Sequence, residues 1–200
     1  MTEGILLGHF ISADGIKVDP AKIDVILKIP TPKTPKEVRT FLGHAGYYRR
    51  FIKNFSKIAS PLFSLLMKDA EFVWTGKCEQ AFLKLKNCVT ATPVLQGPNW
   101  ELSFHIATDA SDMAVGVILG QLEDKKPYAI YYINKNLTPV EHSYTITEKE
   151  FLAVMHAINK FRHYITGYQA FVHTDHAAIQ FLMKNPVTNG RVTRWLFFLQ

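Results

Sequence analysis

Three carboxylates, spread over residues 102–175, are the side chains of this sequence best suited to chemistry. Asp109 follows an alternating apolar stretch that predicts a β-strand, Glu150 lies in the first turn of a predicted helix, and Asp175 ends another predicted strand. Two carboxylates about 4 Å apart repel by roughly 4 kcal/mol at an effective dielectric constant of ~20, so a cluster of three needs a compensating charge. Oxygen-rich sites suit Mg²⁺ or Mn²⁺, and paired divalent ions are a common device for attack at a phosphodiester.

Each of these acids also has a purely structural interpretation. Asp109 opens an Asp-Ala-Ser-Asp segment that is typical of a turn. Thr147-Glu-Lys-Glu150 has the pattern of a capping box, in which Thr147 caps the helix and Glu150 bonds back to its start. Asp175 is suited to cap the helix that follows it. The residues taken singly leave both interpretations open.

The elements that must position these acids follow from hydrophobic periodicity. Strands are predicted over 102–109, 113–121, 127–133 and 168–174, and helices over 148–164 and 176–183. His173 shares a strand face with Asp175, where it is either a neighbour of a metal site or simply packed or exposed.

Four motifs in this half of the chain occur in a dense, ordered series. They are Thr108-Asp-Ala-Ser-Asp112 with Gly116 and Leu119-Gly-Gln121, then Tyr144-Thr-Ile-Thr-Glu-Lys-Glu-Phe-Leu-Ala153, Lys160-Phe-Arg-His-Tyr164 and His173-Thr-Asp-His176. Together they resemble the ribonuclease H domain of gypsy-type LTR retrotransposons, most closely the plant ones. The likeness extends upstream through almost the whole chain. It implies an α/β (α+β overall) fold, a ribonuclease H-like mixed sheet with flanking helices, preceded by a small helical thumb and a palm-end hairpin.

The resemblance also implies a metal site. In that family four carboxylates hold two Mg²⁺ ions, with Mn²⁺ as an alternative, and the motifs place the first three at Asp109, Glu150 and Asp175, as catalytic residues and metal ligands. Glu150 is preferred to Glu148 because the apolar run that follows the family's acid begins after it. The family's fourth aspartate lies further downstream, and no Asp or Glu follows Asp175 here. We therefore expect a domain truncated before its last acidic motif.

Composition and charge add a second signal. The 200 residues are 48% hydrophobic, which permits a sizeable core, and they lack a secretion signal or an apolar run long enough for a membrane span. Two cysteines ten residues apart on one predicted helix are expected to be reduced thiols, and the protein intracellular, in a cytoplasmic particle or the nucleus. Residues 1–100 carry 14 Lys and Arg against 8 Asp and Glu, whereas residues 101–200 carry 9 of each. A basic first half suits a polyanionic partner; the alternative is an ordinary soluble surface.

The first half predicts an apolar strand over 4–12, a turn at 13–15 and a returning strand, then helices over 20–28, 34–50, 56–68 and 75–89. Asp19, Thr34 and Thr75 are expected to cap the first, second and fourth of these helices, and Thr34 forms a capping box with Glu37. Turn residues over 90–100 predict a domain boundary there. By resemblance, residues 1–29 are the end of a reverse-transcriptase palm with a primer-grip-like hairpin, 30–72 a helical thumb, 73–98 a connecting helix and linker, and 99–200 the ribonuclease H domain.

The helix predicted over 34–50 has two different faces. One carries Arg39, Gly43 and Tyr47 at four-residue spacing. The other is an apolar stripe of Val38, Phe41, Leu42, Ala45 and Tyr48. Glycines at 43 and 46 cost about 1 kcal/mol each relative to alanine, which the close approach of another backbone would justify. By resemblance this helix lies in the minor groove of a template–primer duplex, and phosphates are contacted by Arg49, Arg50, Lys53 and Lys57. Alternatively, the glycines admit a neighbouring protein helix and the basic residues form a solvated face.

Two functions follow. The first is a reverse transcriptase/ribonuclease H fragment that binds an RNA–DNA hybrid or template–primer duplex, works with the rest of a retrotransposon polyprotein and cleaves the RNA strand. The second is a non-catalytic nucleic-acid-binding or domesticated remnant that lacks the fourth carboxylate.

Overall fold

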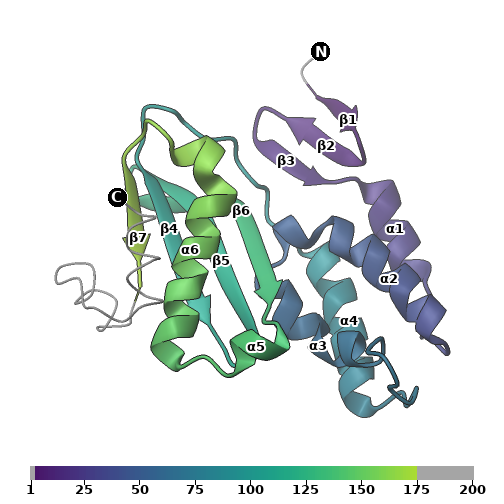
Figure 1. Cartoon of the computed structure of the whole chain (residues 1–200). Helices are drawn as coiled ribbons and strands as arrows, with labels where there is room; N and C mark the ends of the chain where they lie inside the picture. Colours follow the sequence, from purple (N-terminus) through teal and green to yellow (C-terminus); the bar gives the residue numbers. More distant parts are fainter. Residues whose placement is uncertain (1–2, 175–200) are drawn as a thin grey trace. The chain divides into compact units, whose positions relative to one another are not determined.

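The computed structural model describes residues 3–174, and its contacts divide the chain into two units (Figure 1). One unit comprises Met1–Pro98 with Ile130–Asn134, and the other Asn99–Ala129 with Lys135–Gln200. The first division falls at Pro98, inside the stretch whose turn residues predict a boundary. Within the described residues, every helix is too short or too polar to cross a membrane.

The first unit begins with a three-stranded antiparallel sheet of β1 (Gly4–Leu6), β2 (His9–Ser12) and β3 (Gly15–Val18). The prediction of a single strand over 4–12 is wrong, because the chain reverses between β1 and β2. Leu7 and Gly8 both have positive φ, 49° and 71°, and Leu6 pairs with His9. A two-residue turn with positive φ at both positions matches the right-handed twist of the strands, so a tight hairpin forms inside the apolar run.

Helices make up the rest of this unit: α1 (Pro20–Lys28), α2 (Pro35–Tyr47), the short 3₁₀ helix η1 (Arg49–Phe51), α3 (Phe55–Ser64) and α4 (Gly76–Thr90). Asp19, Thr34 and Thr75 cap α1, α2 and α4 as predicted, each accepting a backbone N–H. The capping box predicted at Thr34 is only half formed, since the Glu37 carboxylate accepts from Lys33 N instead. The chain also leaves α2 earlier than expected, because it tightens into η1.

The apolar stripe of α2 is confirmed as core, since all its predicted residues are buried: Val38, Phe41, Leu42, Ala45 and Tyr48. Phe41 packs against Phe82 of α4, with ring centroids 4.5 Å apart. The helix predicted over 56–68 is expected to bury Leu62, Phe63, Leu65 and Leu66. Leu62 and Leu65 are buried, whereas Phe63 and Leu66 are only half-buried. Both cysteines of α4 are free thiols.

The second unit is built on a mixed sheet with strand order β6-β5-β4-β7. Its strands are β4 (Phe104–Ala110), β5 (Ala114–Glu123), β6 (Lys126–Asn136) and β7 (Ala170–His173), with Ile130–Asn134 of β6 grouped in the first unit. β4 is antiparallel to β5 and parallel to β7. After the short α5 (Pro139–His142), α6 (Ile146–Ile165) connects the antiparallel part to β7 and packs on β4 and β5 (Figure 1). The predicted mixture of strands and a buried helix is confirmed; the helix predicted over 176–183 lies outside the described residues.

A buried glutamine stabilises the start of this unit. Gln121, on β5, is 1% exposed, and its Nε2 donates to the carbonyls of Asn99 and Leu102 at 2.7 and 2.9 Å. Its Oε1 accepts from Asn99 N at 2.9 Å and from the Tyr128 hydroxyl at 2.7 Å. Both polar atoms are thus satisfied by two separate segments, the turn at Asn99–Leu102 and β6, and this positions the strand that leads to Asp109.

Replacing Gln121 with leucine should lower the free energy of unfolding by about 2–4 kcal/mol, because several buried groups lose their partner at once. Urea denaturation followed by circular dichroism measures this loss. Glu123→Ala, at the exposed end of the same strand, is the matched control. A loss no larger than that of the control would contradict the stabilising role of Gln121.

Candidate active site and nucleic-acid groove

The start of α6 decides the role of its two glutamates. Thr145 is the N-cap, and its hydroxyl accepts from Glu148 N, while the Glu148 carboxylate accepts from Thr145 N at 3.0 Å. The capping box is therefore Thr145 with Glu148, and its placement at Thr147 and Glu150 is wrong. Because the helix begins two residues earlier than predicted, Glu150 lies in its second turn and is not needed for capping.

Glu150 is directed instead at the end of β4. Its side chain is buried, with the residue 7% exposed, and Oε1 accepts a hydrogen bond of 3.1 Å from Ala110 N. Taking a carboxylate out of water costs several kcal/mol unless hydrogen bonds or charges compensate it. This contact brings the Glu150 carboxylate against the residue that directly follows Asp109.

Asp109 itself is exposed near the end of β4, opposite Gly116 of β5. The side-chain bonds of the following turn are made by Ser111, whose hydroxyl donates to Ala114 O and accepts from Ala114 N. Among residues 3–174, no hydrogen bond or ion pair joins the Asp109 carboxylate to another group. Turn formation is therefore not the role of this side chain.

Asp175 lies outside the described residues. The strand that precedes it, β7, runs parallel to β4, with Ala107 paired to His173. Because the carboxyl ends of parallel neighbours lie at one edge of a sheet, β4 and β7 both lead toward the edge that carries Asp109. Within residues 3–174, which do not include Asp175, no three His, Cys, Asp or Glu side chains form a metal-binding group.

His173 pairs with His105 of β4. The two rings stack with centroids 5.1 Å apart, and His105 Nδ1 lies 2.8 Å from His173 Nε2. Burial, and secondarily the charge of His173, lowers the pKa of His105. His173 is exposed, so its side chain combines a packed ring face with solvent contact.

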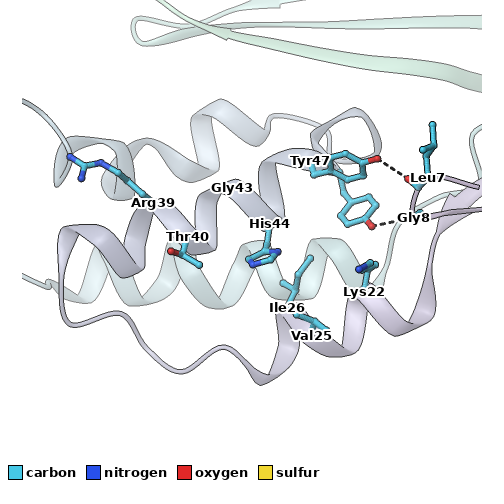
Figure 2. A pocket seen from close by; sticks show the side chains of 11 residues that line it. Leu7, Gly8, Lys22, Val25, Ile26, Arg39, Thr40, Gly43, His44 and Tyr47 are labelled. Carbon is cyan, nitrogen blue, oxygen red and sulfur yellow. Dashed lines mark hydrogen bonds between the residues drawn. The ribbon is translucent and has the colours of Figure 1, made fainter.

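In the first unit, Arg39, Gly43 and Tyr47 of α2 all line one groove of about 670 Å³ (Figure 2). A Cβ added at Gly43 would meet no atom within 4 Å, and one at Gly46 would meet only Phe55 at 3.8 Å. Within the described residues, neither glycine is therefore needed for a neighbouring protein helix. The space above Gly43 is open to an external partner.

The other wall of the groove comes from α1 and from the β1–β2 turn. The groove is also lined by Lys22 of α1 and by Thr40 and His44 of α2, three residues that the sequence analysis did not predict. Thr40 and His44 follow Arg39 and Gly43 by one residue and have the same four-residue spacing. This spacing could have predicted that they share the groove-lining face of α2.

Two tyrosines join α2 to the β1–β2 turn. The Tyr47 hydroxyl donates to Leu7 O at 2.7 Å, as Figure 2 shows, and the Tyr48 hydroxyl donates to Gly8 O at 2.9 Å. Burial raises the pKa of Tyr48, with smaller contributions from Tyr47 and Asp19. Tyr47 is 55% exposed and lines the groove, while its hydroxyl is hydrogen-bonded to Leu7 O.

The four predicted phosphate contacts differ in exposure. Arg49, Lys53 and Lys57 are exposed. Arg50 is half-buried, and its guanidinium carbon lies 4.5 Å from the centroid of the Tyr131 ring, a cation–π arrangement. Arg50 thus has a structural partner that the other three lack among the contacts described.

Comparison with known proteins shows the family of this chain. A family described as "RNase H-like domain found in reverse transcriptase" matches residues 99–200. The chain belongs to this family. It is 39% identical, over 96% of its length, to the retrovirus-related Pol polyprotein from transposon 297 of Drosophila melanogaster, and 34% identical to the Tf2-3 polyprotein of Schizosaccharomyces pombe. These matches cover 18% and 15% of the two polyproteins.

Solved structures show the same fold. A foamy viral protease-reverse transcriptase in complex with RNA/DNA hybrid matches all of this chain and 28% of that chain, with a TM-score of 0.81 and 24% identity. The same enzyme in complex with dsDNA matches with a TM-score of 0.82. The fold of this reverse-transcriptase segment is therefore a ribonuclease H-like mixed sheet with flanking helices, preceded by helices and a small antiparallel sheet. Its relatives are gypsy-type Pol polyproteins; the plant origin stays a prediction.

Replacing Glu148 with alanine should lower the free energy of unfolding by about 1 kcal/mol, because the α6 capping box is lost. Urea denaturation measures this effect, with Glu71→Ala, at an exposed position before α4, as the control. An unchanged stability would contradict the assignment of the box to Thr145 and Glu148.

Proposed function

We propose that this chain is part of a retrotransposon reverse transcriptase whose second unit hydrolyses the RNA strand of an RNA–DNA hybrid. The ribonuclease H-like family generally uses divalent metal ions. Asp109, Glu150 and Asp175 are proposed to hold two Mg²⁺ ions, or Mn²⁺ in their place. The single observation that carries this proposal is the hydrogen bond from Ala110 N to the buried Glu150 carboxylate, which brings this carboxylate to the residue that directly follows Asp109.

The chemistry of the residues present fits such ions. A buried carboxylate beside an exposed one is an all-oxygen donor set of the kind that Mg²⁺ prefers. Bound divalent ions would supply an activated water and stabilise the leaving 3′ oxygen. The chain's own contribution is placement: β4 presents Asp109, and α6 directs Glu150 to the same strand end. Selectivity for RNA is proposed to arise from contacts to the 2′-OH.

The groove of the first unit is proposed to hold the nucleic-acid duplex. Arg39, Gly43 and Tyr47 would face the minor groove, and Arg49, Lys53 and Lys57, with Arg50 as a weaker candidate, would contact phosphates. The open space above Gly43 and the excess of basic residues in this half of the chain support this binding mode. In this proposal residues 1–29 are the end of a polymerase palm, 30–72 a thumb and 73–98 a connection to the ribonuclease H domain.

Asp109→Asn should reduce Mg²⁺-dependent cleavage of the RNA strand to the metal-free level while hybrid affinity is kept, since the fold loses one charge and no packing. Fragment release from an end-labelled hybrid measures cleavage, and fluorescence anisotropy measures binding. Asp124→Asn, in the exposed β5–β6 turn at a φ of 49° that asparagine tolerates, is the control. Hybrid binding without cleavage by the unsubstituted chain would instead support the non-catalytic alternative.

Gly43→Ala should raise the stability of α2 by about 1 kcal/mol, because alanine is the better helix former. The same change should weaken hybrid binding roughly tenfold, about 1.4 kcal/mol, because a methyl group then occupies the floor of the groove. Gly46→Ala is the matched control: it brings the same gain in helix propensity on a face that does not line the groove. Equal affinities of the two variants would contradict duplex binding at this face.

A further inference from the structure

The turn that follows Asp109 is bonded to three other elements. His142 Nδ1, on α5, lies 2.8 Å from Asp112 O, and Leu137 N, after β6, donates to Met113 O at 2.9 Å. The third contact is an ion pair, in which Lys149 Nζ of α6 donates to Asp112 Oδ1 at 3.0 Å. Contacts with other parts of the chain therefore hold this turn in place, in addition to the bonds that Ser111 makes within it.

The two partners of the ion pair differ in their environment. The Lys149 side chain is 8% exposed, whereas the Asp112 side chain is 90% exposed. An ammonium group that leaves water needs a partner, and a lysine stem packs readily along apolar surface. An ion pair with one partner in solvent contributes little to stability. Stability alone is therefore a weak reason to bury a lysine here.

The positions of the bonded residues give a better reason for burying Lys149. Lys149 and Glu150 are consecutive on α6, and they bond to Asp112 and Ala110, which are two residues apart on the turn. With the Ala110–Glu150 bond alone, the turn would be joined to α6 at a single point. Two bonds from adjacent residues of one helix fix both the distance and the orientation of the segment that carries Asp109.

We propose that Lys149 is a positioning residue for the carboxylate site. Through Asp112 it holds the β4–β5 turn on α6, so that Ala110 N–H stays directed at Glu150 and the separation of Asp109 from Glu150 is maintained. The link to metal binding rests on the proposed function; the link to the turn rests only on the contacts described.

The first test uses the metal-free chain and does not depend on activity. Lys149→Met keeps the stem and removes the charge, Asp112→Asn removes the exposed partner, and Lys149→Arg is the conservative variant. Amide hydrogen exchange at Ala110, read by NMR, should become roughly tenfold faster in Lys149→Met and Asp112→Asn through local opening, and stay near the original rate in Lys149→Arg. Lys160→Met, an exposed lysine on the same helix, should leave it unchanged.

The double variant Lys149→Met/Asp112→Asn should exchange no faster than either single variant, because the two residues act as one pair. Unchanged exchange at Ala110 in Asp112→Asn, whose exposed site leaves folding intact, would overturn the proposal. So would independent effects that add in the double variant.

The second test measures Mn²⁺ affinity by electron paramagnetic resonance. Lys149→Met and Asp112→Asn should each bind Mn²⁺ roughly tenfold more weakly, as residues that orient ligands do. In the cleavage assay kcat should fall while KM for the hybrid stays constant. Weaker Mn²⁺ binding with unchanged hydrogen exchange at Ala110 would mean that Lys149 acts through its charge. That result would overturn the proposal that Lys149 positions the β4–β5 turn. Absence of Mn²⁺ binding by the unsubstituted chain would contradict the proposed function, while the exchange result would still decide the role of Lys149 at the turn.

Discussion

The second unit depends on a carboxylate that is held out of water. Glu150 is buried, and its hydrogen bond from Ala110 N joins the second turn of α6 to the end of β4. A buried negative charge is tolerated only where donors or cations compensate it, so this position constrains both the helix and the strand. The mixed sheet, the early start of α6 and the bonded β4–β5 turn are all consistent with that single requirement.

The first unit has a groove along α2. Large side chains such as Arg39 and Tyr47 line it, and Gly43 between them leaves open space in the middle of the helix. The helix tolerates this glycine because its opposite face is fully buried against neighbours such as Phe82. Tyr47 and Tyr48 then bond the groove wall to the β1–β2 turn, so that α2 and the hairpin form one continuous surface.

Much of the local structure was predictable, because it depends on short-range chemistry. Asp19, Thr34 and Thr75 cap their helices through side chains two or three residues away from the N–H they satisfy. One error arose where two residues were equally suited to the same role. Thr145 and Thr147 each precede a glutamate by three residues, and only the packing of α6 on the sheet selects the first. The turn at Leu7 and Gly8 was missed because a single glycine within an apolar run is a weak turn signal, and Leu7 is not a residue that usually adopts positive φ.

The sequence by itself determined the order of the acids, the excess of basic residues in the first half and the exposed face of α2, since each follows from residue type and spacing. Only the tertiary structure decided which glutamate turns toward β4, that Lys149 is bonded to Asp112, and that the α2 face lines a groove with α1 and the hairpin turn. Those contacts join residues roughly 20–40 positions apart. Such partners are selected by the packing of whole elements, which a local pattern does not encode.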